Sequence, residues 1–148
     1  MTTDALARYG PRIRAIRPGL EIESIVVNDE GLANEVVLVN GEWVFRFARD
    51  SDWARRALAA EIKVLELIRG RLPVRVPEPF YADEGALAYR YLPGEALSRD
   101  LIYSLDAGPR RALALQLGEF LRALHELPAE HDPQWFVAHL GGARDLRG

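Results

Sequence analysis

Two kinds of hydrophobic pattern follow each other along the chain. Short runs rich in valine, isoleucine and aromatic residues dominate the first part and are typical of β-strands. Apolar residues at helical spacing dominate the last part. We expect strands over residues 20–28, 34–39 and 42–48 and in both arms of a hairpin within 80–92. We expect helices over residues 3–16, 50–70, 98–105 and 110–127.

Turn and capping residues give the expected boundaries. Glycine, proline and asparagine interrupt regular structure at defined positions, and small polar residues cap helix starts. The boundary signals are a helix break or kink near Gly10–Pro11, hairpin turns at Asn40–Gly41 and Asp83–Gly85, a helix start at Asp50 or Ser51, a helix stop at Gly70, and a turn over 106–109.

This order of elements predicts an α+β fold. Antiparallel hairpins with one interposed helix form one layered unit, and only helices follow it. We therefore expect an antiparallel sheet of about five strands, with one interposed helix, followed by a partial helical region. The composition shifts at Pro93–Gly94, so we place a first lobe at residues 1–93 and a second part at 94–148.

The Asn40–Gly41 pair predicts the register of the second and third strands. Asn-Gly favours a two-residue turn because both central residues need positive φ. The aromatic face of this hairpin should be the core, since large apolar rings favour burial. The expected pairs are Val39 with Glu42, Val37 with Val44, and Glu35 with Arg46. The expected faces are Val37, Val44 and Arg46 on one side and Val36, Leu38, Trp43 and Phe45 on the other.

Two charges interrupt apolar surfaces. Arg46 lies at the end of an apolar strand face, and Glu61 lies in the middle of the apolar stripe of the next helix. A buried carboxylate requires a partner. One interpretation pairs Arg46 with Glu61, as kinase-like proteins pair a strand cation with a helix glutamate to hold nucleotide phosphates. The alternatives are a solvated Arg46 paired with Glu35 across the hairpin, and a Glu61 that reaches water.

Composition narrows the class of protein. The 148 residues fit one domain or one lobe of a larger protein. A net charge of −3 gives no basic surplus for nucleic acid or anionic membranes. The absence of cysteine excludes disulfides and thiolate metal sites. No apolar run is long enough to span a membrane, and the N-terminus lacks the pattern of a signal peptide, so we expect a cytoplasmic protein.

Four segments in a characteristic order resemble the aminoglycoside phosphotransferase family. They read EGLANEVVLVNGEWVFRFAR, AAEIKVLELIRGRLPVRVPEPFY, YRYLPGEAL and LGEFLRALHEL, within residues 20–127. The family consists of small-molecule kinases with a protein-kinase-like fold. The resemblance implies a nucleotide-binding N-terminal lobe, the start of a helical lobe, and ATP or GTP with Mg²⁺ as cofactor. The acceptor would be a hydroxyl group of an aminoglycoside, macrolide or similar antibiotic.

The resemblance also implies roles for individual residues. Main-chain groups at the hinge would bind the edge of the base, although an ordinary strand end before Pro93 explains that segment as well. The implied nucleotide contacts are Gly31 and Asn34 in the phosphate-covering loop, Val37 and Val44 above the base, Arg46 and Glu61 as the ion pair, and the Arg90 carbonyl and Leu92 amide at the hinge.

The family's catalytic loop has no counterpart in the sequence. That loop resembles H-G-D-x-x-x-x-N, with an aspartate for the acceptor hydroxyl and an asparagine for Mg²⁺. The three asparagines of the chain are Asn28, Asn34 and Asn40, all before the hinge. We therefore predict no catalytic or metal-binding residues here, no turnover by this chain alone, and acceptor binding only with a C-terminal lobe supplied.

Two other functions fit the sequence. The first is a non-catalytic binding module whose apolar helix stripe pairs with a second copy or a partner chain. The second is an α+β domain without a nucleotide site. The stripe consists of Leu113, Leu117, Phe120, Leu121 and Leu124.

Overall fold

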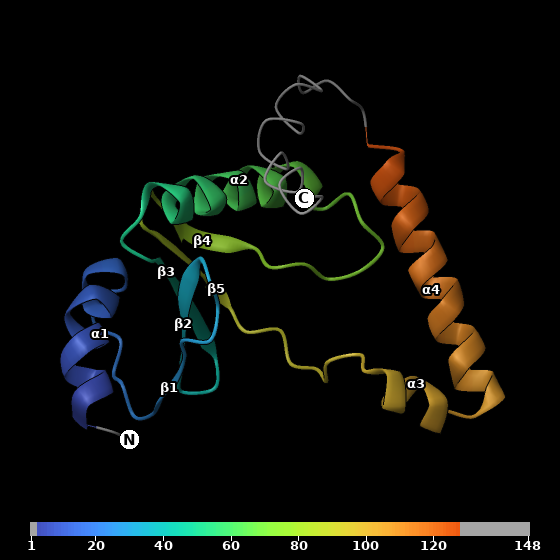
Figure 1. Ribbon diagram of the computed structural model, residues 1–148, viewed down its shortest axis with the longest axis horizontal. Helices are drawn as coiled ribbons and strands as arrows, with labels where there is room; N and C mark the ends of the chain where they lie inside the picture. The colour runs from blue at the N-terminus through green and yellow to red at the C-terminus, as the bar shows by residue number, and fades with distance from the viewer. Residues whose placement is uncertain (1–2, 128–148) are drawn as a thin grey trace, which may run out of the picture.

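The structure is a computed structural model that describes residues 3–127 of the chain (Figure 1). It confirms the α+β class and the sheet of five antiparallel strands. The remainder of the expected second part, residues 128–148, lies outside the described residues. The elements are α1 (Thr3–Ile16), β1 (Ile25–Asn28), β2 (Asn34–Val39), β3 (Trp43–Ala48), α2 (Asp52–Ile68), β4 (Pro79–Ala82), β5 (Ala86–Arg90), α3 (Arg99–Ser104) and α4 (Ala107–His125).

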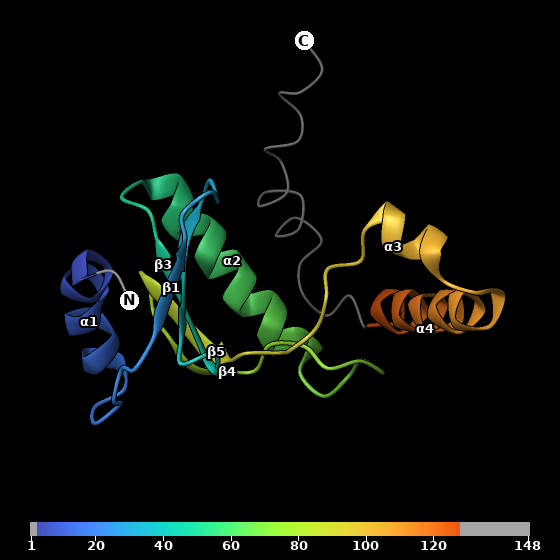
Figure 2. The same cartoon turned by 90° about the horizontal axis from the view of Figure 1, so that it is seen from below.

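The sheet separates two helices. Its strand order is β1-β2-β3-β5-β4, with every neighbouring pair antiparallel. Helix α1 lies against one face and α2 against the other, as both views show (Figures 1 and 2). The side chain of a strand residue therefore points toward α1 or toward α2, according to its place in the alternation.

The aromatic core lies on the α1 face. Tyr9 and Ile13 of α1 are buried against Phe45 and Phe47 of β3, and the rings of Tyr9 and Phe47 stack at 5.9 Å. The guanidinium of Arg12 covers the Phe47 ring at 4.0 Å, which closes this core toward solvent. The expected burial of the aromatic strand face is confirmed.

A smaller aliphatic core lies on the α2 face. Leu58, Leu65 and Ile68 of α2 pack on Leu87 of β5. The helix begins where expected, because the Ser51 side chain accepts a hydrogen bond from the amide of Ala54 at 3.1 Å. It ends before Gly70, whose positive φ of 66° favours glycine.

The register of β2 and β3 differs by one residue from the expected one. Asn40 and Gly41 have positive φ, as predicted, but the connection includes Glu42 as a third residue. The Glu42 amide donates to the Val39 carbonyl at 3.0 Å, while its carbonyl accepts from Tyr91 at 2.7 Å. The predicted pairs are therefore wrong. The observed pairs are Val39 with Trp43, Val37 with Phe45, Val36 with Arg46, and Glu35 with Phe47.

The shifted register exchanges residues between the two faces. Val37 lies on the α1 face and is fully buried in the aromatic core. Val36 and Leu38 share the other face with Val44 and Arg46 instead. The prediction that grouped Val37 with Arg46 is wrong because a slip of one residue inverts the face of every side chain in the strand.

Other expected boundaries also change. Helix α1 continues through Pro11, where a break or kink was expected. Burial of Tyr9 and Ile13 on either side stabilises the helix by roughly 1.5–3 kcal/mol per side chain, which offsets the roughly 3 kcal/mol cost of an internal proline. Strand β1 covers only residues 25–28. Residues 107–109 form the first turn of α4, where Pro109 costs little because amides of the first turn have no helical acceptor.

Helices α3 and α4 extend away from the sheet (Figures 1 and 2). No residue of α4 is buried among the described part of the chain, and Leu117 and Leu121 of the expected stripe are 49% and 41% exposed. Only the end of the stripe, at Leu124, packs against the aliphatic core of the α2 face. Within residues 3–127, no helix is both long and apolar enough to cross a membrane.

The Asp83 side chain stabilises the turn between β4 and β5. Its carboxylate accepts hydrogen bonds from the amides of Gly85 and Ala86, at 2.8 and 2.7 Å, and from the Tyr81 hydroxyl at 2.5 Å. Burial raises the pKa of Asp83, but these hydrogen bonds together hold it below the ordinary value of 3.8. The ionised carboxylate therefore stabilises the fold above about pH 4, and this contribution is lost as the pH falls through the folded-state pKa.

We expect Asp83→Asn to lower the free energy of unfolding at pH 7 by about 0.5–1 kcal/mol, because water screens this exposed carboxylate. The loss should shrink at about pH 3, where the wild-type side chain is protonated in the unfolded state. Urea denaturation at pH 7 and at about pH 3 measures the free energy of unfolding of both proteins. Glu84→Gln in the same turn is the control, and an equal loss in both variants would contradict the role of Asp83.

Candidate functional site

Arg46 and Glu61 form an ion pair between β3 and α2. Arg46 Nη1 donates to Glu61 Oε1, and the two side chains are 24% and 30% exposed. The alternative partner, Glu35, lies on the α1 face and interacts with Arg8 and Arg49. The structure therefore answers the open question about Arg46: its ion pair crosses to the helix and does not run across the hairpin.

Asn34 holds the same guanidinium from a second side. The residue is 5% exposed at the start of β2. With its amide oriented to satisfy both ends, Asn34 Oδ1 accepts from Arg46 Nη2 at 2.9 Å and Nδ2 donates to the Ala33 carbonyl at 3.2 Å. Arg46 is thus fixed by a carboxylate and an amide, and its guanidinium has further N–H groups for a ligand.

The Arg46–Glu61 ion pair affects the pKa of the Tyr89 hydroxyl. It lies opposite Val44 in the sheet and packs on the aliphatic core of the α2 face. Burial raises the pKa of the Tyr89 hydroxyl above its ordinary value of 10.0; the positive charge of Arg46 opposes the rise and the Glu61 carboxylate adds to it. The phenol therefore remains neutral beside the ion pair at physiological pH.

An apolar surface extends from Arg46 toward β1. Val44 is 5% exposed, Val36 and Leu38 are half-buried, and Val26 of β1 is 61% exposed. All four side chains lie on one face because their strands pair in register. Sequence reasoning missed Val26, Val36 and Leu38 at this site. No local signal identifies them, since the Asn-Gly pair is compatible with either length of connection.

The β1–β2 loop, residues 29–33, packs closely on its own strand. A side chain at Gly31 would place its Cβ only 2.9 Å from the Asn34 carbonyl oxygen, so this position requires glycine. Arg49, directly after β3, donates from Nε to the Gly31 carbonyl at 2.9 Å and from Nη2 to the Asp29 carbonyl. Sequence reasoning missed Arg49, one of many arginines in this chain.

The segment after β5 leaves the sheet beside the β2–β3 connection. The Arg90 guanidinium pairs with Glu42 at 2.9 Å, and the Tyr91 amide donates to the Glu42 carbonyl. Main-chain groups alternate in direction along a strand, so the Arg90 carbonyl points to the side opposite the Tyr91 amide. Leu92 follows, half-buried. Of the two predicted hinge positions, Arg90 is the last residue of β5 and Leu92 lies two residues beyond it; the Tyr91 amide between them is held by Glu42.

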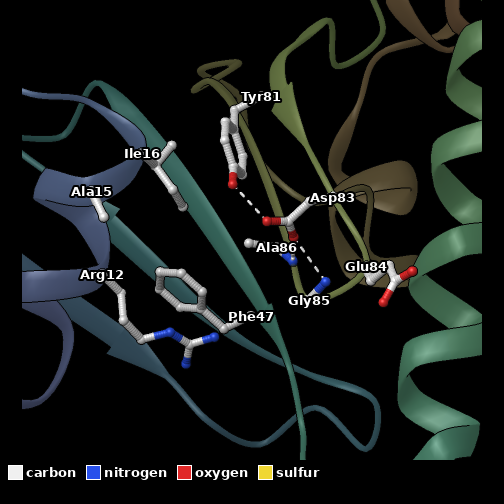
Figure 3. A pocket seen from close by; sticks show the side chains of 9 residues that line it. All are labelled: Arg12, Ala15, Ile16, Phe47, Tyr81, Asp83, Glu84, Gly85 and Ala86. Atoms are coloured by element: carbon white, nitrogen blue, oxygen red, sulfur yellow. Dashed lines mark hydrogen bonds between the residues drawn. The ribbon is translucent and has the colours of Figure 1, made fainter.

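A separate open groove of about 500 Å³ lies on the α1 face, between α1 and the β4–β5 turn (Figure 3). Arg12 and Ile16 form one wall, Phe47 the floor, and Tyr81 and Asp83 the other wall. The Tyr81 hydroxyl donates a hydrogen bond to the Asp83 carboxylate, so these two polar groups are already paired with each other. The groove and the Arg46–Glu61 pair are on opposite faces of the sheet.

The arrangement around Arg46 is suited to binding an anion that is attached to an apolar group. A fixed cation supplies the charge, and the neighbouring valines supply a flat apolar surface. Among residues 3–127 there is no group of three or more histidine, aspartate or glutamate side chains that could hold a metal ion.

Comparisons with known proteins show the family and the fold of this chain. The model of a family described as the phosphotransferase enzyme family, APH, matches residues 24–146. The search of curated proteins gave no match. A solved GDP and kanamycin complex of APH(2″)-IIIa is 34% identical with a TM-score of 0.74, over 83% of this chain and 43% of that chain.

Two further solved structures have the same fold. The GDP complex of wild-type aminoglycoside 2′-phosphotransferase-IIIa is 32% identical with a TM-score of 0.73, over 84% of this chain and 43% of that one. The streptomycin–ATP complex of APH(2″)-IIa, at 19% identity and a TM-score of 0.71, covers 82% of this chain and 40% of that one, and shows the fold alone. The chain thus spans less than half the length of these structures. It contains the kinase-like N-terminal lobe, as the sequence predicted, and it belongs to the phosphotransferase enzyme family.

Proposed function

We propose that this chain is the nucleotide-binding part of a small-molecule phosphotransferase that uses ATP or GTP. One observation carries the proposal: Arg46 lies on the sheet with its guanidinium fixed by both Glu61 and Asn34. Two partners for one cation restrict its rotamers in advance, so little conformational entropy is lost when it binds a phosphate.

In the proposed site, Arg46 binds the α- and β-phosphates. Glu61 keeps the guanidinium oriented and prevents it from turning to solvent. Asn34 joins Arg46 to the β1–β2 loop, whose Gly31 allows close approach of the main chain. The loop would then cover the phosphates. Mg²⁺ would arrive with the nucleotide as its metal complex.

The base would lie along the apolar surface beside Arg46. Val44, as the sequence analysis proposed, and Val36, in place of Val37, lie on the correct face. Val26 and Leu38 extend the surface. The Arg90 carbonyl and the Leu92 amide would bind the polar edge of the base at the hinge. We also place the boundary between the nucleotide lobe and the helical part near residue 93, shortly after β5 ends at Arg90; Figure 1 shows the chain leaving the sheet after this strand.

The relatives support a nucleotide as donor and an aminoglycoside as acceptor. The structure at 34% identity is a complex with GDP and kanamycin. We therefore propose that the whole enzyme transfers a phosphate to a hydroxyl of an aminoglycoside or similar antibiotic, and so confers resistance. Its site of action would be the cytoplasm, where ATP and GTP are available.

Glu61→Gln tests the site. The variant keeps the size of the side chain but removes the charge that orients Arg46. We expect the affinity for ATP or GTP to fall by about 10- to 150-fold, because hydrogen bonds between charged groups contribute about 1.5–3 kcal/mol. Isothermal titration calorimetry measures the affinity directly. At about 100 times Kd, the wild-type chain should also gain about 2.7 kcal/mol of stability.

Glu66→Gln, the same substitution on the exposed side of α2, is the matched control. It should bind nucleotide as the wild type does. Equal affinities for the wild type and Glu61→Gln would contradict the role assigned to the ion pair.

The 148-residue chain alone should transfer no phosphate. No asparagine follows Asn40, so the chain has no counterpart of the family's H-G-D-x-x-x-x-N loop. A radiolabelled phosphate-transfer assay with kanamycin as acceptor checks this. Product above the level of a heat-denatured sample would contradict the prediction.

A second candidate function is partner binding through α4. The exposed Leu115, Leu117 and Leu121, at 60%, 49% and 41%, favour it. If a second copy covers this helix, the chain is a dimer in multi-angle light scattering and the double variant Leu117→Glu, Leu121→Glu is a monomer. Leu32→Glu, an exposed leucine in the β1–β2 loop, is the control. A monomeric wild-type chain would contradict this dimer.

A further inference from the structure

We propose that Arg49 is a positioning residue that sets the conformation of the β1–β2 loop, and that Glu35 and Arg8 anchor it to α1. The inference rests on the proposed nucleotide site and adds the means by which its loop is held. Arg49 itself has no role in the binding or chemistry assigned above.

Arg49 holds the loop at three points. Its main-chain amide donates to the Ala33 carbonyl at 2.9 Å. Its Nε donates to the Gly31 carbonyl at 2.9 Å, and its Nη2 donates to the Asp29 carbonyl. The fork of a guanidinium is well suited to two acceptors at fixed spacing, which a single ammonium group cannot reproduce.

Apart from Arg49, few contacts fix the shape of the loop; one of them is the Asn34 side chain, whose Nδ2 donates to the Ala33 carbonyl at 3.2 Å. Leu32 is 85% exposed, so no apolar burial holds the tip. The Asn28 side chain accepts from the Glu30 amide at 3.1 Å, but this contact is local to one turn. Arg49 therefore holds the carbonyls of Asp29 and Gly31, and it shares the Ala33 carbonyl with Asn34.

Because Arg49 binds carbonyl groups of the β1–β2 loop, it also fixes the direction of the amide groups that follow them. All peptide bonds of the described residues are trans, and in a trans peptide the carbonyl and the following amide point in opposite directions. Binding of the Gly31 carbonyl by Arg49 therefore turns the Leu32 amide away from the guanidinium. A main-chain amide held in this way is a ready donor for a phosphate oxygen.

A buried carboxylate fixes Arg49 in turn. Glu35 is 8% exposed and lies on the α1 face, 3.7 Å from Arg49 Nη1. Arg8 of α1 donates to the same carboxylate oxygen. A carboxylate at this depth requires such partners, because an unpaired buried charge is costly. The chain of contacts runs from α1 through Glu35 and Arg49 to the loop.

A purely structural role and a positioning role predict different results. Loss of general stability would weaken binding of every part of the nucleotide together. Loss of the loop conformation should weaken phosphate binding and leave the base contacts on the sheet unchanged. Comparison of nucleoside triphosphates with the matching nucleosides separates these roles.

The test uses Arg49→Lys in the full 148-residue chain, which keeps the charge and loses the fork. Backbone ¹⁵N order parameters of residues 29–33, measured without ligand, should fall from about 0.85 to below about 0.6. Affinities for ATP and GTP should weaken about 10- to 150-fold, as expected for the loss of a hydrogen bond to a charged group. Affinities for adenosine and guanosine should not change.

Arg55→Lys is the control, since Arg55 pairs with Asp50 and Asp52 at the exposed start of α2. If Arg49→Lys fails to fold, Glu35→Gln takes its place, with a smaller change in the same direction. A loop that stays rigid, or equal losses for triphosphate and nucleoside, would overturn the proposal. The order parameters need no ligand. A wild-type chain that binds neither triphosphate would instead overturn the nucleotide site, while a loosened loop would still support anchoring by Arg49.

Discussion

The rest of the structure depends on the connection between β2 and β3. Its three residues, Asn40 to Glu42, set a register in which Val37 opposes Phe45 and Val36 opposes Arg46. Alternation along β3 points its aromatic rings toward α1 and Arg46 toward α2. The register then places Val37 of β2 beside the rings and Val36 beside Arg46. A shorter connection would bring valines of β2 to the wrong face and expose part of the aromatic core.

Two arginines form ion pairs on opposite faces of the sheet. Arg46 faces α2, where Glu61 and Asn34 hold it. Arg49, three residues on, interacts with Glu35 on the α1 face and with the carbonyls of the β1–β2 loop. One strand and its continuation therefore connect both helices to the site where phosphates would bind. Each cation has an anionic partner, so neither carries the cost of an unpaired charge in a partly buried position.

Helix α4 differs from the rest of the described structure in how its apolar residues are packed. The sheet and its two helices bury their own apolar faces, whereas α4 carries a row of leucines that the described residues leave largely exposed. Only Leu124 and Leu127 pack on the aliphatic core of the α2 face. The sheet and its two helices thus form two buried cores, while the leucines of α4 remain largely exposed.

Local chemistry along the chain was sufficient to predict the α+β class, a sheet of about five strands, the caps of α2 and the two positive-φ residues of the hairpin. It also identified Arg46 and Glu61, since charges on apolar faces are visible in the pattern. The register could not be predicted in this way, because it depends on contacts with a distant segment, where the Glu42 carbonyl accepts a hydrogen bond from the Tyr91 amide. Two other features could not be predicted from local sequence for the same reason: α1 continues through Pro11, and Arg49 binds the carbonyls of the β1–β2 loop. They depend on burial and on contacts between residues far apart in sequence, which no local pattern records.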